Sequence, residues 1–254
     1  MKARPRSKNR PNKTVRTQLD LSISGTTFSL SADLPAGPTT TRKMLPVFRS
    51  VCTTVISETV KNIESQGRSI SCCAGCGACC RQMVPLSSTE IAHIKEVVEK
   101  MPTDRREQIT ARFSDAVSRF EDSGLIDELR LSEKPSGSAY HDLGLAYFAQ
   151  GVACPFLEDE SCSIHKDRPL ICREYLVVSP AENCKRQNGQ PVEVLGLPLS
   201  ASKALAKVDG DVRFNKWIPM ILALEQPDHP EPAVSGAGVA NEFFSNLVGR
   251  KLTQ

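Results

Sequence analysis

Nine of the ten cysteines of this chain fall into two sets that lie far apart in the sequence. The first set occupies one short stretch, CCAGCGACC, and comprises Cys72, Cys73, Cys76, Cys79 and Cys80. The second set comprises Cys154, Cys162, Cys172 and Cys184. Two cysteines separated by two residues can direct both thiolates toward one soft metal. If the two sets bind a common inorganic centre, the chain must fold so that they meet, and this requirement constrains the fold more than any other feature.

The composition is that of an ordinary globular protein, with 40% apolar and 24% charged residues. No apolar run approaches the roughly 20 residues that a membrane helix requires, and the N-terminus lacks the apolar region of a secretory signal. We therefore expect a cytoplasmic protein without a membrane partner. In that reducing compartment, cysteine clusters bind metal more often than they form disulfides. The adjacent cysteine pairs and the length of the chain also make a disulfide scaffold the poorer explanation.

The net charge of +3 is unevenly distributed. The first 19 residues contain seven Lys and Arg residues and no acidic residue. Such a basic arm could contact nucleic acid or an anionic surface. It is the only part of the chain that we expect to do so, because aromatic residues, at 5%, are too sparse for a nucleic-acid platform. The interpretation that we favour is a solvated, disordered terminus.

Hydrophobic periodicity predicts a mainly helical α+β protein with small β-hairpins. Alternating apolar residues predict a hairpin at 18–34, and helical spacing predicts a helix at about 42–65 with Cys52 in its buried stripe. Ser87 and Glu90 form a capping-box pattern that opens a further helix. The other predicted elements are helices at about 104–122, 124–131 and 138–149, a hairpin at 152–164, a short helix after Pro169, and helices at about 200–208 and 239–250.

The stretch from 72 to 80 is expected to be a loop, in which Gly75 and Gly77 permit positive φ angles and close backbone approach. These elements predict a metal-organised domain with a flank on either side. The expected segments are a disordered basic arm at 1–17, a hairpin and helix packing on the core at 18–69, a cysteine-cluster domain at 70–185 and a C-terminal helical extension at 186–254.

The cysteine spacing is compatible with two kinds of metal centre. Cys73, Cys76 and Cys79 have the spacing of the first three ligands in bacterial ferredoxin loops, whose remaining cysteine precedes a proline, as Cys154 does here. Zinc ribbons also use a Cys-x-x-Cys pair that is closed by a distant pair. Because thiolates suit both, the softness of the ligands does not choose between zinc and an iron–sulfur cluster.

The adjacent cysteines suggest a second site. Side chains of neighbouring residues usually diverge, so we expect Cys80 to serve a site other than that of Cys79, together with Cys162, Cys172 and either Cys184 or His165. Eight sulfurs then divide into two groups of four, and Cys72 remains as a spare, packed or exposed thiol. The predicted metal ligands are Cys73, Cys76, Cys79, Cys80, Cys154, Cys162, Cys172 and Cys184.

Three arginines and one histidine lie close in sequence to these cysteines. Arg81, Arg168 and Arg173 could offset the negative charge of a four-thiolate site through N–H···S contacts, or they could be ordinary surface residues. His165 could be a ligand, a hydrogen-bond donor to a ligand, or a plain hydrogen-bonded histidine.

Two blocks of this sequence resemble a known family. The first is Cys73-Ala-Gly-Cys76-Gly-Ala-Cys79-Cys80-Arg81, and the second combines Cys154-Pro155-Phe156-Leu157 with Cys162-Ser-Ile-His165-x-x-Arg168-Pro169-x-x-Cys172-Arg173. Together they resemble the CxxCxxCC family, also called the YkgJ-type cysteine cluster or zinc- or iron-chelating domain, over about residues 70–185. The resemblance implies metal binding through these cysteines and a relation to flagellin lysine N-methylases. Members typically carry an aromatic residue or histidine at the position of His165, which argues against obligatory ligation there, and Cys72 is not part of the pattern.

The function that we expect is a metal-binding protein that holds zinc or an iron–sulfur cluster for a structural or regulatory purpose. One alternative, implied by the resemblance, is a lysine N-methylase-like enzyme that uses an iron–sulfur centre. The second alternative is metal trafficking or sensing through exchange-prone thiolates such as Cys72 and Cys80. The sequence indicates no catalytic residue, no organic cofactor and no protein partner.

Overall fold

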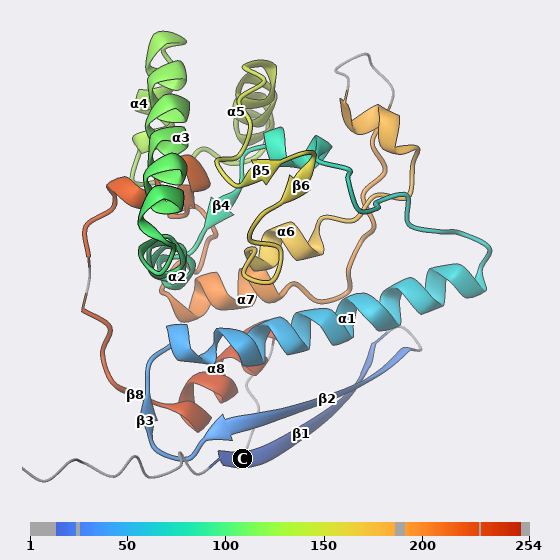
Figure 1. The fold of residues 1–254 in the computed structure, drawn as a ribbon. Coiled ribbons are helices and arrows are strands. Elements are labelled where there is room, and N and C mark those ends of the chain that lie inside the picture. The colour runs from blue at the N-terminus through green and yellow to red at the C-terminus, as the bar shows by residue number, and fades with distance from the viewer. Residues whose placement is uncertain (1–13, 24–25, 186–190, 229, 250–254) are drawn as a thin grey trace, which may run out of the picture.

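The structure is a computed structural model, and it describes residues 14–23, 26–185, 191–228 and 230–249. The chain is mainly helical, with two-stranded antiparallel sheets, as the sequence predicts (Figure 1). Most of the basic arm, residues 1–13, lies outside the described residues. Within the described part of the chain, no helix combines the length and the apolar character needed to cross a bilayer.

The predicted N-terminal hairpin is confirmed and is longer than the pattern indicated. Strand β1 (Thr14–Ile23) pairs antiparallel with β2 (Thr26–Pro35), in a register that sets Thr14 opposite Pro35. The end of the predicted arm, residues 14–17, is therefore part of a strand. Phe28 and Leu34 of β2 are buried and attach the hairpin to the first core.

That core joins the two ends of the chain. Helix α1 (Leu45–Ser65), which follows the short η1 (Arg42–Met44), packs on β2 and runs along the β1–β2 hairpin (Figure 1). It contacts α6 (Leu170–Glu174) and α7 (Ala201–Val208), and α7 packs on α8 (Gly236–Val248). The rings of Phe48 and Phe243 stack with their centroids 4.1 Å apart. Cys52 is fully buried here, as its place in the apolar stripe predicts.

A second helical layer carries the remaining cores. It consists of α2 (Ser88–Glu99), α3 (Thr103–Asp122), α4 (Ile126–Arg130) and α5 (Ser138–Ala149). The capping box is present, because Ser87 and Glu90 each bond the other's backbone N–H. Strand β4 (Pro85–Leu86) pairs with β7 (Ile218–Pro219), and the short η4 (Met220–Glu225) packs on α2 and α3.

The last helix begins three residues earlier than periodicity predicts. Strand β8 (Val234–Ser235) pairs with β3 (Pro38–Thr39). The Ser235 hydroxyl accepts a hydrogen bond from the N–H of Gly238 at 3.3 Å and so caps α8, which starts at Gly236. A Cβ at Gly236 would lie 2.6 Å from the carbonyl oxygen of Pro35. The start of α8 is therefore set by a tertiary contact that the sequence pattern does not contain.

Candidate metal centre

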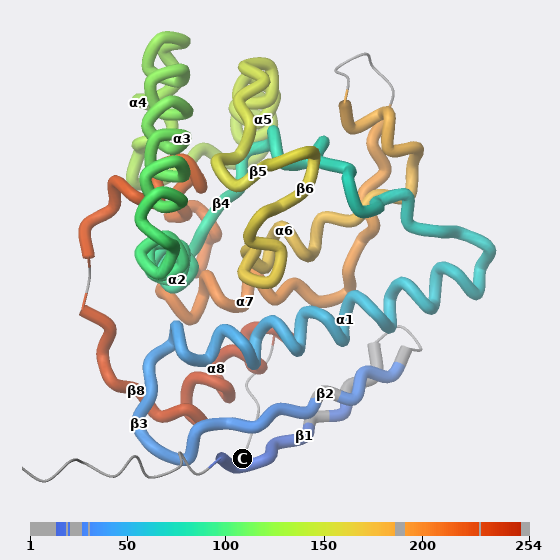
Figure 2. Tube along the Cα trace, viewed as in Figure 1, coloured from blue at the N-terminus to red at the C-terminus, as the bar shows by residue number. Residues whose placement is uncertain are grey.

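The two cysteine sets meet in space. The first set leads into η2 (Ala78–Arg81), and the second lies on a hairpin of β5 (Leu157–Glu158) and β6 (Ser161–Cys162), on α6 and on η3 (Ala181–Lys185). The N–H of Cys154 donates to the carbonyl of Cys80 at 2.7 Å, which ties one set to the other. Figure 2 shows the chain passing from the β5–β6 hairpin directly into α6. The requirement that the sets converge is thus met.

Five thiols line one small cavity of about 90 Å³. They come from three separate parts of the chain: η2, the β5–β6 hairpin and α6. Arg168 and Tyr175 line the same cavity, and apolar side chains such as Phe156 and Met220 form the rest of its wall. The five cysteines are Cys79, Cys80, Cys154, Cys162 and Cys172.

Backbone N–H groups are aimed at two of these sulfurs. The N–H of Phe156 donates to the thiol of Cys154, and the N–H of Ile164 donates to that of Cys162, so each acts to lower the pKa of its cysteine. Burial acts in the opposite direction and is stronger, raising the pKa of Cys154 to about 12. A bound cation would reverse that balance, because it stabilises the thiolate directly.

The thiols of Cys79 and Cys80 lie closer together than the sequence pattern predicts, and their assignment to separate sites stays a prediction. The Cys80 thiol donates a hydrogen bond to the Cys79 sulfur, which lowers the pKa of Cys79 to about 7 and raises that of Cys80, and both residues line the cavity. Successive side chains alternate in an extended loop, but these two residues occupy a single 3₁₀ turn in which the N–H of Cys80 bonds the carbonyl of Gly77 at 3.0 Å. The stretch from 72 to 80 is therefore only partly a loop.

The other predicted ligands lie elsewhere. Cys76 and Cys184 pack with Ala78 and Val177 in a separate small core, and Cys73 is exposed. His165 is also exposed and does not line the cavity; its backbone N–H bonds the carbonyl of Cys162. Five of the eight predicted ligands are thus brought together in one place, and Cys73, Cys76 and Cys184 are not.

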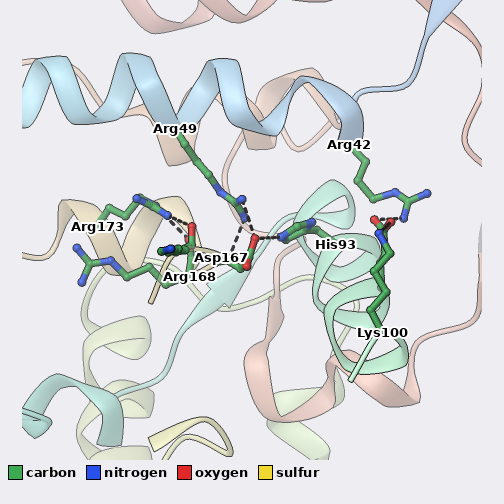
Figure 3. Close-up of polar contacts among 9 residues, drawn as sticks. Arg42, Arg49, His93, Lys100, Asp167, Arg168 and Arg173 are labelled. Carbon is green, nitrogen blue, oxygen red and sulfur yellow. Dashed lines mark hydrogen bonds and ion pairs between the residues drawn. The ribbon is translucent and has the colours of Figure 1, made fainter. Parts of the chain in front are cut away.

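Of the three arginines, Arg168 alone has a place in the cavity wall. Arg81 is paired with Glu160 at 2.6 Å and also donates to the carbonyl of Gly77. Arg173 donates to the backbone carbonyls of Arg168 and Lys166 (Figure 3). The Nε of Arg168, by contrast, is buried and has no partner among the described residues. An orphaned cationic N–H at the wall of a thiol-lined cavity fits a negatively charged sulfur site.

The turn that carries Arg168 is held by a clamp that the sequence did not reveal. Arg49 of α1 donates to the side chain of Asp167 at 3.2 Å and to its carbonyl at 2.9 Å. The Nε2 of His93, from α2, lies 3.1 Å from the same carboxylate (Figure 3). Two helices thereby fix the segment between Cys162 and Cys172. These partners come from three distant parts of the chain, so no spacing pattern could have indicated them.

The kinds of ligand that line the cavity, rather than the present positions of their sulfurs, indicate which metal centre the site suits. Among the described residues, no three His, Cys, Asp or Glu side chains are close enough to hold an ion as they stand. Rotation about χ1 between staggered rotamers changes where a cysteine sulfur points without moving the backbone. Clustered thiols, N–H donors aimed at sulfur and a guanidinium with an unpartnered Nε–H are together surroundings that suit thiolate-bound zinc or an iron–sulfur cluster.

Comparison with known proteins agrees with this geometry. Residues 72–191 match a family model, CxxCxxCC, whose description is "Putative zinc- or iron-chelating domain". The match contains both cysteine sets and the Asp167–Arg168 turn. No curated protein and no solved structure matched the chain. Over residues 72–191, the chain is therefore similar to the CxxCxxCC family of zinc- or iron-chelating domains.

Proposed function

We propose that this chain holds zinc or an iron–sulfur cluster through cysteine thiolates, and that the centre has a structural or regulatory role. The observation that carries the proposal is the single cavity lined by five thiols from three separate parts of the chain. Cys80, Cys154, Cys162 and Cys172 would provide four sulfurs there. Such a centre would cross-link η2, the β5–β6 hairpin and α6.

The energy of this cross-link is large compared with the stability of a domain. A structural zinc site contributes roughly 10–16 kcal/mol of apparent binding free energy, whereas a whole domain is stable by about 5–15 kcal/mol. Four thiolates around a divalent cation carry a net charge of −2, and the unpaired Nε–H of Arg168 would offset part of it. The cavity wall thus supplies both the ligands and the counter-charge.

The size of the cavity favours this role over the enzyme alternative. Sites for small organic molecules usually measure about 300–1,000 Å³, whereas the cysteine cavity is about 90 Å³. A lysine side chain and a methyl donor would not fit together beside these sulfurs, so the lysine N-methylase-like alternative gains no support from the cavity. For metal trafficking we expect rapid loss of the ion to a mild chelator while the fold persists. The cytoplasmic location inferred from the sequence stays a prediction.

The proposal is tested by elemental analysis of freshly isolated protein, with zinc, iron and acid-labile sulfide measured per chain. Cys172→Ala and Cys52→Ala form a matched pair, because both remove a half-buried or buried thiol but only Cys172 lines the cavity. We expect Cys172→Ala to lose metal and Cys52→Ala to keep the wild-type content. Wild-type protein without stoichiometric metal would contradict the proposal, and so would equal metal content in the two variants.

A further inference from the structure

The cysteine cavity contains one sulfur too many for a single centre. Tetrahedral zinc sites and cubane iron–sulfur clusters both use four protein ligands, and five thiols line the cavity. The hydrogen-bonded pair Cys79 and Cys80 supplies two of the five. One member of this pair is therefore available to another site.

A second group of thiols lies around a small core of its own. Cys76 and Cys184 pack against the same buried pair, Ala78 and Val177, and η2 contacts η3, which carries Cys184. The thiol of Cys72 belongs to this group, because it accepts the backbone N–H of Val177 at 3.3 Å. Three sulfurs from two distant segments thus surround one small core.

The position of Cys72 is fixed by its neighbour. Ser71 donates its N–H to the carbonyl of Val177 at 2.9 Å, and its hydroxyl lies 3.0 Å from the same carbonyl. The hydroxyl also lies 2.6 Å from the carbonyl of Ser179. This pairing directs the Cys72 sulfur onto the 177–184 segment. Cys73, one residue later, is exposed as Cys72 is, but it is part of no cavity or core in the described part of the chain.

Cys79 lies between the two groups. On one side it lines the cysteine cavity. On the other side its turn, η2, contacts η3, which carries Cys184. Tyr175 separates the groups, since it lines the cavity and also packs against the core that contains Cys184.

We propose that the chain has a second thiolate metal centre, in which Cys72 takes the place that sequence spacing gives to Cys73. This inference rests on the proposed function and assigns its sulfurs. The first centre consists of Cys80, Cys154, Cys162 and Cys172, and the second consists of Cys72, Cys76, Cys79 and Cys184. The ligand chemistry of both is that of zinc or an iron–sulfur cluster, and Cys73 is the thiol left over.

Cys72→Ser and Cys73→Ser test the assignment, because they make the same change at adjacent residues. Zinc, iron and labile sulfide are measured per chain in both variants and in the wild type. We expect the wild type to contain two centres, Cys73→Ser to contain two and Cys72→Ser to retain one. The centre that remains in Cys72→Ser also shows that this variant folds. Alkylation of the metal-loaded wild type, read by mass spectrometry, gives an independent result that needs no variant: Cys73 should react and Cys72 should be protected.

The possible outcomes separate the two proposals. If the wild type contains a single centre, or if Cys73→Ser rather than Cys72→Ser loses metal, the second centre as assigned is wrong while the proposed function stands. If both variants keep two centres, the assignment is wrong as well. If the wild type contains no metal, both proposals fail together.

Discussion

Gly77 lies where the first cysteine set meets the β5–β6 hairpin, and replacing it with alanine tests whether that contact controls metal binding. An added Cβ would lie 2.7 Å from the Cδ1 of Leu157, 2.7 Å from the Oε2 of Glu160 and 3.1 Å from the Cα of Glu160. The φ of Gly77 is −89°, a negative value within the range that alanine can adopt. The cost of Gly77→Ala is therefore steric and does not include backbone strain.

The magnitude follows from which atoms can move. The two side-chain ends can rotate away, but the backbone at Glu160 must retreat by a few tenths of an ångström to restore an ordinary contact. Overpacking of this kind costs about 1–3 kcal/mol. The displaced hairpin carries Cys162, and Cys154 precedes it, so both sulfurs would move away from η2. If the strain falls on the metal-bound state, the dissociation constant of zinc rises by roughly tenfold to a hundredfold.

The assay is competition for Zn²⁺ with a chromophoric chelator, alongside urea unfolding of each variant. Gly124→Ala is the matched control, because Gly124 has a φ of +74° and no atom within 4 Å of its added Cβ. That variant should lose about 1–2 kcal/mol of unfolding free energy through backbone strain and should bind zinc as the wild type does. Equal zinc affinity in Gly77→Ala and Gly124→Ala would refute the reasoning.

Three further predictions concern charge, pH and the shared core. Arg168→Gln removes the guanidinium whose Nε–H is buried without a partner among the described residues, so we expect roughly tenfold weaker zinc binding by chelator competition. Unchanged affinity would count against a role for this charge. Burial raises the pKa of Glu90 to about 7 from an ordinary value of 4.5. The folded state therefore keeps the Glu90 proton to a higher pH than the unfolded state does. The resulting contribution to the free energy of unfolding, on the order of 2–3 kcal/mol, is full below pH 4.5 and is lost as the pH rises through 7. In urea unfolding, the free energy of unfolding of Glu90→Gln should lack this pH dependence. The titration of the thiols is common to both proteins and cancels when the variant is compared with the wild type. Parallel pH profiles of the two proteins would contradict the raised pKa of Glu90. Phe243→Ala should lower the unfolding free energy by about 3–5 kcal/mol, because it removes the ring that stacks on Phe48, and a loss below about 1 kcal/mol would show that the ends of the chain do not share a core.

The elements that the sequence predicted well are those specified by local interactions. Helix α2 begins at a capping box whose two bonds both lie within four residues, and α3 repeats its apolar residues at helical spacing. The hairpin at β5–β6 was predictable from its short acidic turn, although its strands are only two residues long. In each case the determinant and its effect lie in the same stretch of sequence.

The features that were mispredicted depend on contacts between distant segments. The side chains of Cys79 and Cys80 converge because η2 forms a tight turn beneath the hairpin, and Gly77 is required there for close approach and not for a positive φ. The Asp167 clamp needs α1 and α2 to lie on the same turn. Spacing predicts that the cysteines are ligands, but it cannot distribute them between proposed centres, because that distribution depends on the tertiary path of the chain.

The cysteine cavity depends on residues from outside the family match, which bears on the predicted domain boundaries. Met220 lies beyond residue 191, yet it is buried and forms part of the cavity wall. Leu170, within the match, is buried in the core that α1 and α8 build from both flanks. A fragment of 70–185 would therefore expose apolar surface at the back of α6 and open the wall beside Cys172. For this reason we expect the flanks to determine how tightly the thiols are held, and we regard them as part of the metal centre's scaffold.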